Sequence, residues 1–441
     1  MNACHLVFVV AVCLLPFSGA SARDDDTNKV DVAILDVLLQ RGIIDVATYE
    51  ELMGLAQAEA DKVRELDLLE NRLRRMQSSG ITASGGKPGK FKVESDDGKW
   101  SLGFKGRLQL QYNGTQADGS GKDENNFMVR RARLAVFGKA GGENTTYKVE
   151  IAAPTQNKVN KDSKKDASVT DAWVNWDLGD RTNVKAGQFK VPYGRAITWV
   201  SSKMNTVEAS LATRHFALGR QPGLMYYGST QDKYIEYGIG AFNGEGAGMA
   251  NTSGRKDSSA TGLLWATRVT WNPLGPVNYD SSAFQTVNTG ETKLALGAGY
   301  YLNQDQPAKG PATAVNPNPV LGDASSDNTG INFNAQLLSG PVSVVTEYFT
   351  IEKKTSGVND KTDRGYNAQV GVQVIPEKWE VVLRQSAIKR AMDDDKTELT
   401  LGLVRYVDKH LSQFTFDVSK VRNQTKHENE MQFRGQYQVV F

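Results

Sequence analysis

The sequence predicts a transmembrane β-barrel of about sixteen antiparallel strands, preceded by a short N-terminal helical coiled coil. Three observations support this fold class. Apolar and polar side chains alternate with a period of two from residue 99 onward, the connections between these segments are long and short in turn, and the chain begins with a secretory signal. Because no later stretch is apolar enough for a membrane helix, insertion would require a closed barrel.

Composition and net charge exclude little. The chain has 441 residues, 39% of them hydrophobic, and 52 basic against 50 acidic side chains. The resulting net charge of +2 gives no argument for nucleic acid as a partner. Any selectivity for charge must therefore come from the placement of individual side chains.

Residues 1–22 are predicted to be a signal peptide. An apolar run over 6–17 precedes a small-residue cleavage pattern at 20–22, and the run is too short to span a membrane. A lipoprotein anchor at Cys13 is the alternative, although the residue before it is not small. Cys4 and Cys13 are the only cysteines, so the mature chain would carry no disulfide and no cysteine metal site.

Residues 23–77 are predicted to form a helical segment in the periplasm. Thr48 and Glu51 suggest a capping box ahead of its second helix. The heptad frame of that helix is apolar at six of eight positions, which favours a coiled coil over a single amphipathic helix lying on a neighbouring domain. The Gly- and Ser-rich residues 78–90 would be a flexible linker to a barrel at 91–441. The heptad frame is Leu52, Leu55, Glu59, Lys62, Leu66, Leu69, Leu73 and Met76.

The strand KWSLGFKGRLQLQY shows the alternation most clearly. Trp100, Leu102 and Tyr112 share an apolar face, while Lys105 and Arg107 share the polar one, as in a strand between lipid and water. A soluble β-sandwich that binds carbohydrate would show the same alternation and stays the weaker alternative. The predicted strands lie near 99–112, 127–139, 144–152, 169–178, 182–191, 222–230, 233–243, 262–272, 291–302, 329–339, 342–353, 363–375, 379–388, 396–407, 411–420 and 428–441.

The connections predict the orientation of the barrel. Eight long polar connections alternate with mostly short turns, and only 273–290 in the short set is long. Outer-membrane barrels have short periplasmic turns and long outside loops, so we expect an outer membrane of a Gram-negative bacterium. The expected partners are membrane lipid and, at a strand that ends on Phe441, the barrel-assembly machinery for which Phe441 would be the insertion signal.

The longest outside connection, near 192–221, is the predicted constriction loop. Arg195, Lys203, Arg214 and Arg220 against Glu208 give it a charge of +3. Folded into the lumen, it would narrow a water-filled pore and place cations where anions pass. The alternative is an outside loop with solvated charges.

Cations on the predicted inner faces complete the site prediction, and the opposing carboxylates Glu150, Asp171, Glu398 and Asp417 make the wall mixed. Neither a GxSxG nor an HExxH motif occurs, so we predict no enzyme, no catalytic residue, no metal and no cofactor. The wall candidates are Lys105, Arg107, Arg131, Arg133, Lys148, Arg268, Lys293 and Arg384.

Four stretches resemble the phosphate-selective porin family of porins O and P: GRLQLQY (106–112), FMVRRARLAVFGK (127–139), GQFKVPYG (187–194) and EASLATRHFALGRQPGLMYYG (208–228). The resemblance implies a homotrimeric sixteen-stranded porin that admits small anions such as phosphate. It places Arg131 and Arg133 at the lumen, and Arg214 and Arg220 on or beside the constriction loop. Relatives specialised for phosphate are richer in lumenal arginine, so specificity for phosphate does not follow from the resemblance. The alternative function is that of a structural or adhesive outer-membrane barrel with a plugged lumen and a coiled coil that reaches through the periplasm.

Overall fold

The computed structural model describes residues 35–42, 45–78, 81–84, 91–119, 121, 123–153, 167–248, 262–309, 320–355 and 358–441. The predicted signal peptide lies outside the described residues. The chain divides into two compact units, 1–81 and 82–441.

The first unit contains helix α3 (Val46–Ser78). The backbone N–H of Thr48 donates to Asp45 Oδ1 at 2.8 Å, so Asp45 caps this helix and the predicted capping box at Thr48 is wrong. The apolar side chains of the heptad frame whose burial is described, Leu52, Leu55, Leu66 and Leu69, are exposed. None of the described helices is long and apolar enough to cross a membrane.

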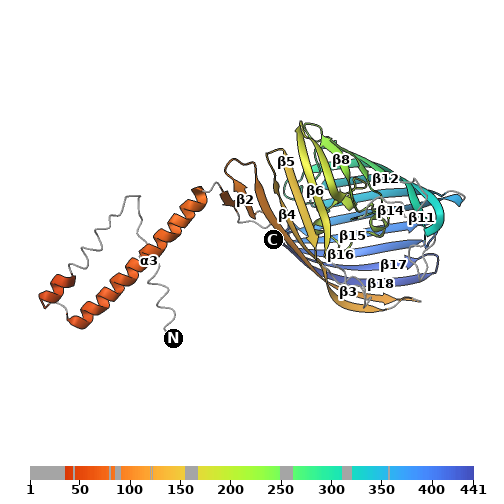
Figure 1. Cartoon of the computed structure of the whole chain (residues 1–441). Helices are drawn as coiled ribbons and strands as arrows, with labels where there is room; N and C mark the ends of the chain where they lie inside the picture. The colour runs from red at the N-terminus through yellow and green to blue at the C-terminus, as the bar shows by residue number, and fades with distance from the viewer. Residues whose placement is uncertain are drawn as a thin grey trace. The chain divides into compact units, whose positions relative to one another are not determined.

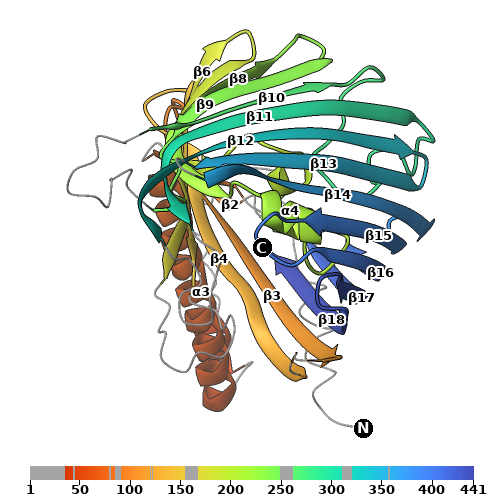
Figure 2. The same cartoon turned by 90° about the vertical axis from the view of Figure 1, so that its right-hand side faces the viewer.

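The second unit is a closed antiparallel barrel of the sixteen strands β3 to β18 (Figures 1 and 2). The last strand closes it on the first, in a register that runs from Glu430 opposite Ala117 to Val440 opposite Arg107. This confirms the predicted strand number and closure. The strands are β3 (Ser101–Ala117), β4 (Glu124–Lys139), β5 (Thr145–Ala152), β6 (Ser168–Gly179), β7 (Thr182–Lys190), β8 (Arg220–Ser229), β9 (Ile235–Phe242), β10 (Leu264–Trp271), β11 (Thr292–Lys309), β12 (Val320–Ser339), β13 (Val342–Thr355), β14 (Val358–Ile375), β15 (Trp379–Lys389), β16 (Lys396–Asp408), β17 (Ser412–Asn423) and β18 (Glu428–Val440).

The main differences from the predicted strands lie at their ends. Strands β11, β12 and β14 begin or end several residues beyond the apolar alternation. Backbone pairing continues there without an apolar face, which a pattern of side chains cannot reveal. Two short strands were not predicted: β1 (Ile81–Ser84) falls in the expected linker, and β2 (Phe91–Ser95) pairs with β3.

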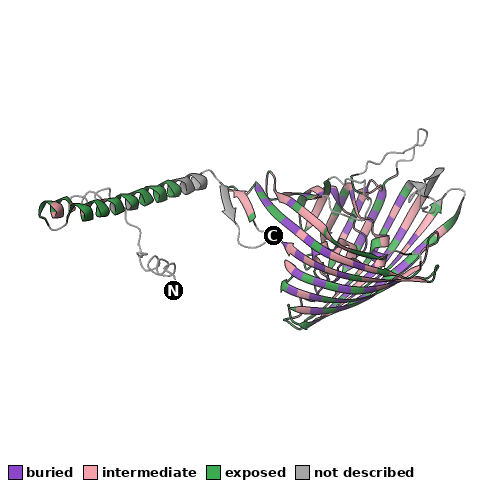
Figure 3. Ribbon diagram, turned by 90° about the horizontal axis from the view of Figure 1, so that it is seen from below, coloured by how far each residue is buried: buried purple, intermediate pink, exposed green. Residues whose placement is uncertain are grey.

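Buried and exposed residues alternate along strands of the barrel (Figure 3). Many of the exposed residues are apolar and many of the buried ones are polar, the reverse of a soluble protein. Along β16, Leu399, Leu401 and Leu403 are exposed, whereas Glu398 and Thr400 are buried. The same alternation of exposed apolar and buried polar side chains continues through β17. An apolar outer band with a polar interior fits lipid outside and water inside, which excludes the soluble sandwich.

Candidate functional site

The connection between β7 and β8, residues 191–219, packs against the inner faces of several strands. It contains two short 3₁₀ turns, Ala196–Thr198 and Ser201–Lys203, and helix α4 (Leu211–Phe216). Ser210 caps α4 by accepting a hydrogen bond from the backbone N–H of Thr213 at 3.0 Å. Phe216 stacks on Phe349 of β13 with ring centroids 5.1 Å apart, within a buried apolar cluster.

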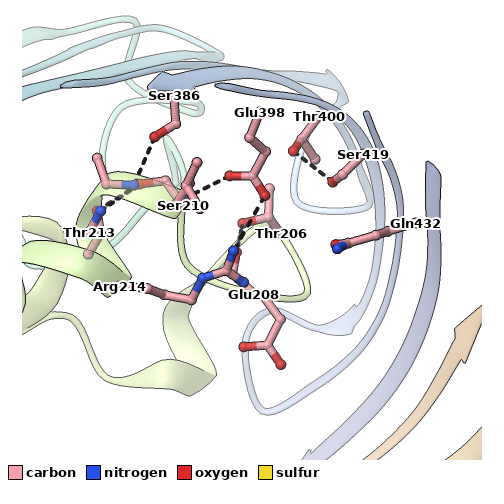
Figure 4. A network of polar contacts seen from close by, with 12 residues as sticks. Thr206, Glu208, Ser210, Thr213, Arg214, Ser386, Glu398, Thr400, Ser419 and Gln432 are labelled. Carbon is pink, nitrogen blue, oxygen red and sulfur yellow. Dashed lines mark hydrogen bonds and ion pairs between the residues drawn. The ribbon is translucent and has the colours of Figure 1, made fainter. Parts of the chain in front are cut away.

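Backbone N–H groups of this connection donate to wall carboxylates. Val207 donates to Asp417 at 2.8 Å, and Leu211 donates to Glu398 at 2.8 Å. Figure 4 shows the surroundings of Glu398. Arg195 and Ala196 donate from their backbone to Glu347. Hydrogen bonds from N–H groups stabilise an ionised carboxylate. The acidic side chains of β13, β16 and β17 are therefore engaged by the connection.

Two predicted cations belong to this contact. The guanidinium of Arg384 on β15 is buried and donates to Thr206 Oγ1 at 2.7 Å and to the carbonyl of Glu208 at 2.8 Å. Arg214 of α4 lies 3.8 Å from the Glu398 carboxylate and is more exposed. Arg384 thus anchors the connection, and Arg214 is the more accessible of the two.

A second group of predicted cations gathers on β3, β4, β5 and β8. These strands come earlier in the chain than β13, β16 and β17, which carry the carboxylates described above. Arg133 donates to Glu150 at 2.9 Å, and Lys148 bridges Glu150 and Asp171 at 3.1 and 2.6 Å. Arg220 donates to Asp171 at 2.6 Å. Arg107 is buried 4.0 Å from Glu150. Two carboxylates thus hold four cations together, which we call the basic wall, defined as Arg107, Arg133, Lys148 and Arg220.

A β-bulge in β4 adds two arginines next to this wall. Arg131 lies opposite Gln109, and Val129 lies opposite Leu110, so Arg130 is the extra residue. Arg130 donates to Glu208 through Nε and Nη2, and Arg131 lies 3.6 Å from the same carboxylate. Burial opposes ionisation of Glu208, but the two arginines outweigh it and lower its pKa to about 2.

Several cations on the inner side of the described barrel were not predicted, among them Arg434 of β18, which donates to Asp417 at 2.6 Å. Besides Arg130, Lys190 donates to the carbonyls of Ile197 and Trp199, and Lys185 lies 4.5 Å from the Trp173 ring centroid and 4.9 Å from that of Tyr227. The bulge in β4 and the positive φ of Gly187 in β7 interrupt the simple two-residue pattern there. Because Lys185 and Lys190 are five positions apart, a strict period of two would place only one of them on the inner face.

The remaining candidates lie elsewhere. Arg195 is fully buried and donates to Gln336 at 2.5 Å, while Arg268 donates to Gly194 O at 3.2 Å. Burial lowers the pKa of Arg195 to about 10, so its side chain stays cationic at neutral pH. Lys105 is exposed on β3, and Lys293 pairs with Glu291 at 3.2 Å. The carbonyl of Lys203 accepts hydrogen bonds from Ser281.

A closed sixteen-stranded barrel with an apolar outside and a polar inside defines the class of outer-membrane porins. The chain belongs to the phosphate-selective porin O and P family, whose model matches residues 102–441. It is an outer-membrane channel protein rather than an enzyme. Its partners, as for a porin, are membrane lipid and the small solutes that pass through the barrel.

Similar proteins show the same fold. An anion-selective porin from Comamonas acidovorans is 14% identical, with 78% of this chain and all of that chain covered and a TM-score of 0.54. A loop-deletion mutant of OmpT from Vibrio cholerae is 13% identical, with 77% and 99% covered and a TM-score of 0.51. An uncharacterized protein of Aquifex aeolicus (strain VF5) is 24% identical over 294 residues, which is 61% of this chain and 68% of that protein. At such identities the solved structures show the fold alone.

Proposed function

We propose that this porin passes small anions such as phosphate in preference to cations, by diffusion through a lumen that residues 191–219 narrow. One observation carries the proposal: the cations on β3 to β8 outnumber the carboxylates beside them. Seven cations meet three carboxylates, Glu150, Asp171 and Glu208, a formal excess of four positive charges. The seven are Lys105, Arg107, Arg130, Arg131, Arg133, Lys148 and Arg220.

The contacts of residues 191–219 support an asymmetric lumen. The carboxylates on β13, β16 and β17 accept hydrogen bonds from this connection or pair with arginine. They are therefore withdrawn from the path of a solute, whereas the basic wall has fewer carboxylates than cations. A cation-rich surface in a narrow lumen raises the local concentration of anions.

The basic wall suits phosphate-like oxyanions without holding them tightly. Guanidinium forks match pairs of oxygen atoms, and lysine ammonium groups act as point charges. Glu150 and Asp171 compete for the same donors, because each already pairs with cations of the wall. Several weak sites of this kind allow an ion to leave again, which passive conduction requires.

Reversal potentials in planar bilayers under a salt gradient test the preference. We expect anion selectivity, and we expect Arg133→Gln to lower the anion-to-cation permeability ratio by about twofold because one wall charge is lost. Lys354→Gln is the matched control, since Lys354 is exposed and pairs with Glu352 at 3.6 Å. Cation preference of the unaltered protein would overturn the proposal. An equal effect of both substitutions would show that the basic wall does not determine the selectivity.

We also propose a homotrimer inserted by the barrel-assembly machinery, with residues 23–77 in the periplasm. The exposed heptad leucines of α3 support association of three helices. Mass measurement of the detergent-solubilised protein tests the trimer. A monomeric mass under conditions where the barrel stays folded would reject it.

A further inference from the structure

The connection between β10 and β11, residues 272–291, is the one long member of the short-turn set, and it is folded inward. Ser281, Ser282 and Ala283 are almost completely buried. Asn272 donates to the carbonyl of Lys233 at 2.8 Å, and Thr286 donates to the carbonyl of Gly340 at 2.8 Å. The connection is thus tied to neighbouring turns at both ends, and its middle lies inside the barrel rim.

Its middle contacts residues 191–219 directly. Ser281 donates to the carbonyl of Lys203 at 2.7 Å, and Asn205 donates to the carbonyl of Ser281 at 3.2 Å. The ring of Tyr279 lies between two arginines, with its centroid 4.8 Å from Arg195 Cζ and 4.9 Å from Arg268 Cζ. These contacts make the two connections one packed unit.

His410, in the turn between β16 and β17, connects this packed unit to the barrel. Its Nε2 lies 2.7 Å from Asp280 Oδ1, and its Nδ1 lies 2.7 Å from Gln413 Oε1. The amide nitrogen of Gln413 donates to the carbonyl of Met204 at 3.0 Å, which leaves the amide oxygen facing His410. Both partners of the ring are therefore acceptors, and only an imidazolium can donate to both.

The surroundings of His410 favour that cation. Asp280 approaches from the connection and Glu380 from β15, where Glu380 accepts hydrogen bonds from Ser282 and Tyr406. Lys409 is the nearby cation, and it pairs with Glu377 at 2.8 Å. Burial lowers the pKa of His410, but Asp280 and the hydrogen bonds outweigh burial and raise it above the ordinary value.

We propose that residues 272–291 form a second constriction of the pore, latched by the Asp280–His410–Gln413 contact and released when His410 loses its proton. A group with a raised folded-state pKa stabilises the latch below that pKa and ceases to do so as the pH rises through it. Loss of the proton removes the hydrogen bond from His410 to Asp280 or the one from His410 to Gln413. Asp280 belongs to the packed unit, and Gln413 donates to the carbonyl of Met204 within it. The inference uses the channel function and is independent of anion preference.

The first experiment measures whether the connection opens. Ala283→Cys supplies a buried thiol in a mature chain expected to have no other cysteine. Its modification by a neutral methanethiosulfonate is divided by that of Ala135→Cys, a similarly buried thiol on β4 away from the latch, so that the ionisation of a buried thiol affects both rates. We expect the relative rate to rise about tenfold or more between pH 6 and pH 9.

Substitutions assign the effect. His410→Gln should abolish the pH dependence, and Asp280→Asn should do the same if His410→Gln fails to fold. His427→Gln is the control, because His427 lies in an exposed turn and should leave the rise intact. A flat relative rate in the parent, or a rise that persists without His410, would overturn the latch.

Single-channel conductance over the same pH range tests the constriction. We expect conductance to increase with the labelling rate and to stay constant in His410→Gln. Labelling that changes without conductance would reject the second constriction. Absence of any conductance, with intact labelling behaviour, would contradict the channel function and leave the latch supported.

Discussion

At the scale of single residues, Glu208 decides how residues 191–219 meet strand β4. One carboxylate receives Arg130 and Arg131 because the bulge in β4 turns both toward it. Hydrogen bonds to charged groups contribute about 1.5–3 kcal/mol each. Glu208 therefore both fixes residues 191–219 and reduces the positive charge beside the basic wall.

We expect Glu208→Gln to increase the anion-to-cation permeability ratio, because the substitution removes a negative charge from a cation-rich region. It should also weaken the attachment of residues 191–219, which proteolysis of the folded barrel can measure. Glu143→Gln changes an exposed carboxylate in the same way and should have no effect. An unchanged permeability ratio in Glu208→Gln would remove Glu208 from the selectivity determinants.

The pH dependence of this contact follows from its depressed pKa. The pKa of Glu208 is about 2, below the ordinary value of a glutamate. Its contribution is complete at neutral pH and is lost only as the pH falls toward 2. We expect the difference in reversal potential between the parent protein and Glu208→Gln to stay constant from pH 7 to pH 4. A change centred near pH 4.5 would show that Glu208 titrates as an ordinary carboxyl group.

At the scale of elements, the pairing of β18 with β3 continues through Phe441. The backbone N–H of Phe441 donates to Gly106 O at 3.0 Å, and that of Gly106 donates to Phe441 O at 2.5 Å. The Phe441 ring lies over Gly106, where an added Cβ would come within 2.2 Å of it. Gly106 therefore provides the space in which the last aromatic side chain completes the seam.

Deleting Phe441 should lower the amount of folded barrel in the outer membrane far more than it changes the conductance of protein that inserts. Gly106→Val should reproduce part of the loss, since its side chain would displace the ring. Phe433→Ala is the control, because Phe433 also faces outward but its removal leaves the closing hydrogen bonds. Heat-modifiable gel migration measures the amount of folded barrel. Equal losses in the Phe441 deletion, Gly106→Val and Phe433→Ala would show that Phe441 contributes no more to assembly than another outward-facing aromatic residue.

At the scale of the whole molecule, the helical segment and the barrel are two separate compact units. The chain divides at residues 81 and 82, and every strand of the barrel lies in the second unit. A barrel satisfies its own backbone hydrogen bonds and needs no helix for closure.

Removal of residues 23–80 should therefore leave a heat-modifiable, conducting barrel. If the exposed leucines of α3 form the predicted coiled coil, the same truncation should reduce the yield of cross-linked trimer. Replacing Leu55 and Leu66 by Gln in the full-length chain separates helix association from deletion of the segment. Undiminished trimer in both variants would reject the coiled coil as an oligomerisation element.

The sequence by itself determined the barrel, the strand number and the two faces. A period of two repeated sixteen times is a local signal, and each strand carries it independently of its partners. It also identified Arg107, Arg133 and Lys148 as inner-face candidates, because their side-chain direction follows from that period, whereas Arg220 was predicted as a cation of the connection near 192–221. The period of two did not predict the Asp45 cap or the extended ends of β11, β12 and β14. Hydrogen bonds of backbone groups decide these features, and side-chain alternation does not report them.

Only the tertiary structure decided which of these charges meet. Residues 130 and 208 come together through a bulge and a folded connection, and Asp280 reaches His410 across 130 positions of sequence. Arg384, an equally good wall candidate by alternation, is buried under the connection and bonded to Thr206. Periodicity fixes the face on which a side chain lies, but contacts within the lumen depend on how long connections fold back, and no local pattern encodes that.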